Sequence, residues 1–234
     1  MRFTGSRVVV AGGGRGIGRR IAERFTAEGA AVAVLDLDPG DDGIAVDVAD
    51  PGSVATAMAE ATDRLGGIDV LANSAGVLHL GGLLDTTVDQ WRRVMDVNAL
   101  GTFLLTQEAG RRMVAAGRGG RIVHIASMAA KKGGANEAAY AASKAAVVAL
   151  GRAAALEWGG HGITVNTVCP GYVPTEMGAA TRTEADIALW SSYSPLGRLG
   201  TTDDVAGTVL FLASDDGAYL TGQAINVTGG MVTH

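Results

Sequence analysis

The chain has 234 residues, of which 47% are apolar and 18% are charged, so it can bury a sizeable core and lacks the composition of a disordered protein. Its net charge of −5 argues against nucleic acid and against an anionic membrane surface as partners, because charge would attract neither. At about 150 residues per domain, the length favours a single domain over residues 1–234.

Short β-branched runs, each followed by a helical pattern, alternate along the chain. Strands are predicted at Arg7–Val10, Ala31–Asp36, Gly43–Val46, Val70–Ala72, Arg121–Ala126, Thr164–Val168 and Ala224–Val227. Helices are predicted at Gly16–Glu28, Pro51–Leu65, Val88–Ala116, Ala138–Trp158 and Thr202–Ala213. Strands that are apolar at every position are typical of a parallel sheet covered on both faces. We therefore predict an α/β fold, a single doubly wound Rossmann-type domain with a seven-stranded parallel sheet and helices on both faces.

The connection between the second and third predicted strands is shorter than the others. Only the six residues Leu37–Asp42 separate the second and third predicted strands, too few for a crossover helix, so we expect that helix to be absent or reduced to a turn. In such folds ligands bind beyond the carboxyl ends of the strands. The residues that directly follow each strand are therefore the candidates for function.

Other classes of site and location are disfavoured by the sequence. The longest uncharged apolar stretch, Val70–Leu84, is interrupted by three glycines and is too short to span a bilayer. The first residues lack the apolar core of a signal peptide, so we expect a cytoplasmic protein. The one cysteine, Cys169, and the four histidines show no metal-ligand spacing, and we predict no metal site.

A glycine-rich segment follows the first strand and opens directly into a helix. Five of the seven residues from Gly12 to Gly18 are glycines, with Arg15 and Ile17 between them. Glycines permit a sharp turn there and bring backbone N–H groups and the helix N-terminus close to a pyrophosphate. The spacing is G-x-x-x-G-x-G, neither G-x-G-x-x-G nor a P-loop. We predict that Gly12, Arg15, Gly16, Ile17 and Gly18 bind a dinucleotide.

The end of the second strand indicates which dinucleotide is bound. Asp36 lies 18 residues after Gly18, close to the spacing of the acid that accepts hydrogen bonds from adenosine ribose hydroxyls. A carboxylate there repels a 2′-phosphate, which favours NAD over NADP, with Leu37 beside it. Arg15 argues in the other direction, since it could pair with that phosphate. We weigh Asp36 more heavily and predict NAD as the cofactor.

A tyrosine and a lysine four residues apart provide candidate proton-transfer groups. Tyr140 and Lys144 share one face of the predicted helix at Ala138–Trp158, and Ser127 directly follows the fifth predicted strand. A phenol is a weak base at neutral pH, and a nearby ammonium stabilises its phenolate and lowers its pKa towards the working range. Tyr140 can then exchange a proton with an alcohol or carbonyl while Ser127 holds the reacting oxygen.

Taken together, these motifs resemble the short-chain dehydrogenase/reductase family over essentially the whole chain. Further matches are Asp47-Val48, Asn73-Ser74-Ala75-Gly76, Val97-Asn98, Pro170-Gly171 and the ending Thr221 to Gly230. The resemblance implies a catalytic tetrad of Asn98, Ser127, Tyr140 and Lys144, in which Asn98 holds a water that links Lys144 to solvent. It also implies that the cofactor meets Asp47, Val48, Asn73, Ala75 and Gly76 on its adenosine and ribose side, and Pro170, Gly171, Val173 and Thr175 at the nicotinamide.

Three residues depart from the family pattern. Ala11 stands where threonine is usual, Ser74 where asparagine is common, and Thr228 where aspartate often precedes the last two glycines. The first two would weaken structural hydrogen bonds near the glycine turn, but no catalytic group is lost.

The substrate is indicated only by the chain's last third. Residues 171–197 are too long for an ordinary loop and carry several aromatic side chains, so we expect a substrate lid. The ending Ile225 to Gly230 resembles that of sugar-alcohol dehydrogenases, which makes a polyol or small hydroxyketone the first substrate hypothesis. The alternatives are a 3-oxoacyl thioester reductase that uses NADPH, and a non-catalytic NADH sensor or structural subunit, against which the intact tetrad argues.

Alanines on several faces of the helix after Tyr140 bear on assembly. A helix that is apolar on several sides has to be covered on several sides, and small side chains allow a partner helix to approach closely. The family resemblance places helices Val88–Ala116 and Ala138–Trp158 in such contacts between subunits. We therefore expect a homotetramer, with cover from the same chain as the alternative.

Overall fold

The computed structural model describes residues 1–177 and 183–234. Its strands are β1 (Arg7–Ala11), β2 (Ala31–Asp36), β3 (Ile44–Ala45), β4 (Val70–Asn73), β5 (Gly120–Ile125), β6 (Ile163–Pro170) and β7 (Ala224–Val227). All of their pairings are parallel, and they form a seven-stranded sheet in the order β3-β2-β1-β4-β5-β6-β7. The predicted doubly wound α/β fold is thereby confirmed.

The strand order changes direction between β1 and β4. The chain runs from β1 outward to β2 and β3, then returns to place β4 on the other side of β1. Loops that follow β1 and β4 therefore leave the sheet edge in opposite directions and open a crevice between them, the usual ligand position in such sheets.

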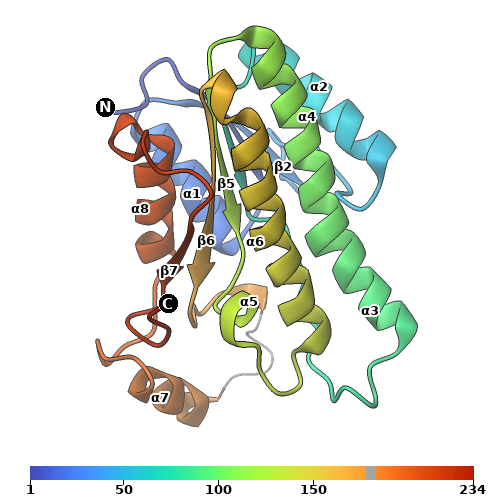
Figure 1. Cartoon of the computed structure of the whole chain (residues 1–234), viewed down its shortest axis with the longest axis vertical. Coiled ribbons are helices and arrows are strands. Elements are labelled where there is room, and N and C mark those ends of the chain that lie inside the picture. The colour runs from blue at the N-terminus through green and yellow to red at the C-terminus, as the bar shows by residue number, and fades with distance from the viewer. Residues whose placement is uncertain (178–182) are drawn as a thin grey trace.

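Helices cover both faces of this sheet (Figure 1). On one face α2 (Pro51–Leu65), α4 (Gly101–Ala116) and α6 (Ala138–Trp158) bury one apolar cluster, whose largest members include Met58, Leu105 and Ile122. On the other face α1 (Gly16–Ala27) and α8 (Thr202–Ala213) bury a second cluster that includes Ile21, Phe25 and Leu210. Near-continuous apolar strands such as β1 are explained by this double cover.

The prediction of one continuous helix over Val88–Ala116 is wrong. The structure divides it into α3 (Val88–Met95), the π-helix η1 (Asp96–Leu100) and α4. A π-helix widens the turn by one residue per hydrogen bond and occurs often at functional sites. Here it surrounds Asn98, which periodicity alone reads as a polar interruption of an ordinary helix.

The connection between β2 and β3 has no helix, as predicted, and β3 is a two-residue strand. Two helices were not predicted, α5 (Ala129–Lys132) and α7 (Glu184–Ser192). Figure 1 shows both at the edge of the sheet towards which β5 and β6 point. None of the helices in the described parts of the chain has the length and apolar character needed to cross a bilayer.

Candidate active site

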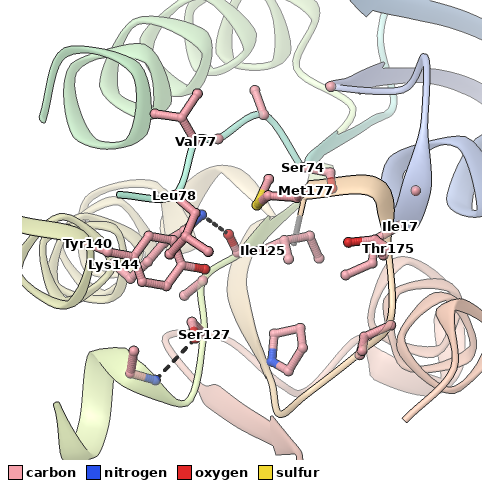
Figure 2. A pocket seen from close by; sticks show the side chains of 18 of the residues that line it. Ile17, Ser74, Val77, Leu78, Ile125, Ser127, Tyr140, Lys144, Thr175 and Met177 are labelled. Carbon is pink, nitrogen blue, oxygen red and sulfur yellow. Dashed lines mark hydrogen bonds between the residues drawn. The ribbon is translucent and has the colours of Figure 1, made fainter. Parts of the chain in front are cut away.

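A pocket of about 900 Å³ opens at the carboxyl ends of the strands. Figure 2 shows Tyr140, Lys144 and Ser127 on one side of it, with Ile17 and Thr175 on the opposite side. Seventeen of the twenty residues predicted from the sequence line this pocket: Gly12, Arg15, Gly16, Ile17, Asp36, Leu37, Asp47, Val48, Ala75, Gly76, Ser127, Tyr140, Lys144, Pro170, Gly171, Val173 and Thr175. Gly18, Asn73 and Asn98 do not line it and lie behind its wall.

The glycine turn after β1 is shaped by close backbone contacts. A methyl group at Gly12 would lie 2.5 Å from the backbone nitrogen of Ala75, and one at Gly18 would lie 1.9 Å from the carbonyl oxygen of Gly12. The backbone of Gly12 is also in the left-handed region, with φ of 70°. Gly18 therefore serves the packing of α1 against the turn, while Gly12 lets the loop after β4 close the same crevice.

The N-terminus of α1 lines this pocket with Gly16 and Ile17. Arg15, its N-cap, makes no side-chain hydrogen bond to the first turn, which also holds no acidic residue. By contrast, α2, α3, α7 and α8 begin with Asp50, Thr87, Thr183 and Thr201, each of which accepts from a backbone N–H. The first N–H groups of a helix and the positive end of its dipole suit an anion. The residues present thus fit the pyrophosphate of a dinucleotide.

Asp36 lies at the end of β2, at the edge of the pocket. Its Oδ2 accepts a hydrogen bond from the backbone N–H of Gly14 at 2.9 Å, and its Oδ1 accepts from Asp38 N–H at 3.3 Å. These bonds hold the carboxylate in place beside the glycine turn. A carboxylate retains further acceptor sites after two such bonds, so it can still accept from ribose hydroxyls.

Asp47 and Val48 line the same end of the pocket in different ways. The Oδ1 of Asp47 accepts from Ala49 N–H at 2.9 Å, so that the side chain shapes its own turn. Val48 is buried, and a methyl group at Gly101 would meet its Cγ2 at 2.8 Å. The wall beside Val48 is therefore set by the start of α4.

Asn73 and Asn98 position the loop after β4. Asn73 Nδ2 donates to Thr102 Oγ1 at 3.0 Å, and its Oδ1 accepts from Ala75 N–H at 3.1 Å. Asn98 clamps the backbone of Val77: its Oδ1 accepts from Val77 N–H at 2.8 Å, and its Nδ2 donates to Val77 C=O at 2.9 Å. Both side chains are buried, and the nitrogen and the oxygen of each amide make at least one hydrogen bond to the chain.

Asn98 also joins this loop to the helix that carries Tyr140. Its Nδ2 donates to Ser143 Oγ at 2.9 Å, and that hydroxyl donates to the carbonyl of Tyr140 at 2.7 Å. A methyl group at Gly76 would lie 3.1 Å from both Asn98 Oδ1 and Lys144 Nζ. The role predicted for Asn98, holding a water that links Lys144 to solvent, stays a prediction; its side-chain nitrogen and oxygen bond to protein groups.

Lys144 is buried, and its Nζ donates to the carbonyl of Ile125 at 2.9 Å (Figure 2). Its ammonium lies 5.8 Å from the centre of the Tyr140 ring. Burial lowers the pKa of Lys144 to about 8, because the charged form loses hydration. The contact with Ile125 fixes the side chain at the carboxyl end of β5.

The pKa of Tyr140 does not follow the expected lowering. Burial raises it to about 12; the interaction with Ser127 lowers it, and the Glu137 carboxylate adds to the rise. The effect of desolvation on the pKa of Tyr140 outweighs that of the hydrogen bond with Ser127. In the protein alone, Tyr140 is therefore a neutral proton donor at neutral pH.

Ser127 follows β5 by two residues, and its Oγ accepts from Ala129 N–H at 3.1 Å. This bond fixes the hydroxyl at the start of α5, on the side of the pocket that holds Tyr140 (Figure 2). The backbone of the same segment is held by a bond from Met128 N–H to Pro170 C=O at 2.8 Å. Ser127 and Tyr140, from two elements, thus face one part of the pocket.

The remaining wall is largely apolar and aromatic. Tyr172 and Trp190 stack with ring centres 4.6 Å apart, and Met177 and Leu78 line the pocket nearby. The predicted lid at 171–197 includes residues 178–182, which lie outside the described residues. Sequence reasoning missed Leu78 and Glu137 as pocket residues. The position of Glu137 one helical turn before Tyr140 was a usable signal, whereas nothing in the sequence paired Tyr172 with Trp190.

Known proteins share this arrangement over nearly their whole length. A family model described as enoyl-(acyl carrier protein) reductase matches residues 11–232. Sorbitol dehydrogenase of Cereibacter sphaeroides is 35% identical, with 98% of each chain covered. The 3-oxoacyl-(acyl-carrier-protein) reductase of Vibrio cholerae is 36% identical, with 99% of each chain covered. The crystal structure of a short-chain type dehydrogenase/reductase from Mycobacterium marinum has a TM-score of 0.91 at 35% identity, covering 99% of this chain and 97% of the other.

Proposed function

Because the chain belongs to the short-chain dehydrogenase/reductase family and is an oxidoreductase, we propose that it transfers hydride between NAD(H) and a secondary alcohol or ketone, with a polyol or small hydroxyketone as substrate. Enzymes of this family use NAD(P)(H) and act on small molecules. The observation that carries the proposal is that Ser127, Tyr140 and Lys144 line one pocket together with the glycine turn at the N-terminus of α1.

The chain's own groups account for the proton in this reaction. When bound, the dinucleotide accepts or supplies the hydride. In the oxidative direction the phenolate form of Tyr140 takes the proton of the alcohol hydroxyl as the hydride leaves the carbon. In the reductive direction the neutral phenol gives a proton to the carbonyl oxygen. Ser127 donates a hydrogen bond to the reacting oxygen. Asn98 acts as a positioning residue through Val77 and Ser143.

The substrate assignment rests on the character of the pocket and on the named relatives. One relative is a sorbitol dehydrogenase and another is a 3-oxoacyl-(acyl-carrier-protein) reductase, so both substrate classes require a direct comparison. We expect larger kcat/KM values for sugar alcohols and ketoses than for 3-oxoacyl thioesters, measured from NADH absorbance at 340 nm. Thioester reduction that proceeds faster, with NADPH as donor, would favour the second class.

We propose NAD as the cofactor because the fixed carboxylate of Asp36 would lie against a 2′-phosphate. Exchanging Asp36→Ala together with Leu37→Arg removes the repulsion and adds a cation, so preference should move towards NADP(H). The measurement is fluorescence titration with NADH and NADPH, with the single Leu37→Arg variant as the control. Tighter binding of NADPH than of NADH by the unmodified protein would refute the assignment.

We propose one cytoplasmic catalytic domain over residues 1–234, with a substrate lid at 171–197 and assembly as a homotetramer. Support for assembly comes from exposed apolar side chains on α6 and α4, where Leu156 is 88% exposed and Phe103 is 42% exposed. Light scattering at micromolar concentration should give four times the chain mass of 23.7 kDa. A mass equal to one chain would rule out assembly, and a dimer would exclude the tetramer.

A further inference from the structure

Glu137 occupies a position in the pocket that the proton transfer described above does not use. It is the N-cap residue of α6, one helical turn before Tyr140, and it lines the pocket. A methyl group at Gly134 would meet its Oε2 at 2.5 Å, so the side chain lies across the Gly134 backbone. Within the described part of the chain its carboxylate accepts no hydrogen bond and forms no ion pair, and it does not cap α6.

The backbone around Glu137 is held in place. Asn136 adopts a left-handed conformation with φ of 63°, and its carbonyl accepts a hydrogen bond from Gly81 N–H at 2.9 Å. The segment before α6 is thereby tied to the loop after β4, which forms the neighbouring wall. At the helix itself, Ala141 N–H donates to the Glu137 carbonyl at 2.7 Å. Glu137 is thus a fixed part of the site rather than a residue on a free loop.

The Glu137 carboxylate lies within electrostatic reach of two pocket hydroxyls. Burial is the main cause of the raised pKa of Tyr140 and of Tyr172, and the negative charge of Glu137 raises both further. Tyr140 lies at the start of α6 and Tyr172 lies after β6, and both line the same pocket as Glu137. A substrate whose reacting oxygen is at Tyr140 has its neighbouring carbons in that pocket.

The chemistry of a carboxylate selects what can occupy this space. An ionised carboxylate only accepts hydrogen bonds, so it favours a hydroxyl group that can donate. A 3-oxoacyl thioester has a methylene next to the reacting ketone and a thioester carbonyl beyond it, so it offers the carboxylate no hydrogen-bond donor. A charged acceptor that is desolvated and unpaired raises the free energy of the complex by more than the hydrogen bond would lower it. Such a site therefore discriminates strongly against substrates without a donor.

We propose that Glu137 is the specificity-determining residue of the site and accepts a hydrogen bond from a hydroxyl on the carbon next to the one oxidised. The assignment rests on the proposed function. It narrows the substrate to a vicinal diol or its α-hydroxyketone. Glu137 touches the substrate away from the reacting proton, so its effect should depend on whether that second hydroxyl is present.

The test compares 2,3-butanediol with 2-butanol, which differ by one hydroxyl on the neighbouring carbon. In the wild-type enzyme with NAD, kcat/KM for the diol should exceed that for the mono-alcohol by about ten- to a hundredfold, the worth of a hydrogen bond to a charged group. Glu137→Leu should reduce this ratio to near one. Glu137→Gln, which keeps one acceptor oxygen, should lie between. Glu157→Leu, an exposed glutamate on the same helix, is the matched control and should keep the wild-type ratio.

A pH profile supplies a readout that a merely structural role would not change. Oxidation requires Tyr140 to accept a proton, so the rate rises with pH as the phenolate forms. Removing the negative charge in Glu137→Gln stabilises the phenolate, lowers the pKa of Tyr140 and shifts the profile to lower pH. Glu157→Gln should leave it in place. The other charged or titratable groups around Tyr140 are unchanged in both variants: Lys144 on α6, Lys132 on α5, His124 on β5, Tyr172 after β6, and Arg93 and Asp96 on α3 and η1.

The possible failures are distinguishable. A wild-type diol to mono-alcohol ratio near one, or a ratio that Glu137→Leu leaves intact, overturns the role of Glu137 while leaving the oxidoreductase assignment standing. A pH profile that is unshifted in Glu137→Gln likewise overturns the role of Glu137 and leaves the oxidoreductase assignment standing. Absence of turnover of every secondary alcohol and ketone by the wild-type enzyme contradicts the proposed function itself, and with it this inference.

Discussion

Replacing Tyr140 with phenylalanine should reduce kcat by about 10²- to 10⁴-fold while NADH binding stays close to wild type. The substitution removes one oxygen atom, and in this site that oxygen acts on the reacting proton. The ring that packs beside Lys144 is kept, so the pocket wall remains intact. Steady-state rates give kcat, and fluorescence titration gives the NADH dissociation constant.

Two further variants serve as comparisons for Tyr140→Phe, one with a broader expected effect and one with none. Lys144→Ala should weaken both turnover and NADH binding, because Lys144 lines the pocket between Tyr140 and the β5 carbonyl of Ile125. Tyr219→Phe removes the same oxygen from a fully exposed tyrosine and should change neither quantity. A Tyr140→Phe enzyme that kept more than about a tenth of the wild-type kcat would contradict proton transfer by the phenol.

Gly18→Ala is expected to weaken both the fold and the cofactor site. The added methyl group would lie 1.9 Å from the carbonyl oxygen of Gly12, an overlap that only a shift of α1 away from the glycine turn can relieve. Overpacking of this kind costs about 1 to 3 kcal/mol, and the shift displaces the N–H groups proposed to bind the pyrophosphate. Thermal unfolding should show a lower Tm, and titration should show NADH binding weakened by about tenfold or more.

The matched control is Gly207→Ala, the same exchange in a helix on the same face of the sheet. A methyl group at Gly207 meets no atom within 4 Å, and alanine is the better helix former by about 1 kcal/mol. This variant should unfold at a temperature equal to or above that of the wild type and should bind NADH normally. If Gly18→Ala behaved like Gly207→Ala, the tight packing of α1 on the turn would be disproved.

Local sequence patterns predicted most of the strands, helices and connections of the fold. The continuous apolar runs and the intervening helical periodicity predicted the parallel sheet, and the six residues between β2 and β3 predicted the missing crossover helix. Both the apolar runs and the short connection are local signals, because adjacent residues are enough to indicate strand burial and connection length. The same holds for Gly12 to Gly18, whose composition indicates close backbone approach, and the structure shows that approach at Ala75 and Gly12.

Features that depend on packing between distant segments could not be predicted in this way. The π-helix at η1 arises where Asn98 bonds both Val77 and Ser143, contacts that periodicity within one helix does not encode. The raised pKa of Tyr140 likewise depends on how much of the chain surrounds the hydroxyl, not on its spacing from Lys144. The stack of Tyr172 on Trp190 joins the segment that follows β6 to α7, which lies well beyond it in the sequence.

The central claim is hydride transfer between the nicotinamide ring and a substrate carbon, and isotope transfer tests it most directly. NADH that carries deuterium at both C4 positions is incubated with the enzyme and an α-hydroxyketone, and the alcohol product is analysed by mass spectrometry. We predict a product that carries one deuterium on the reduced carbon with the wild-type enzyme, and almost none with Tyr140→Phe. An alcohol product without deuterium, or no alcohol product from any ketone supplied, would contradict the assignment.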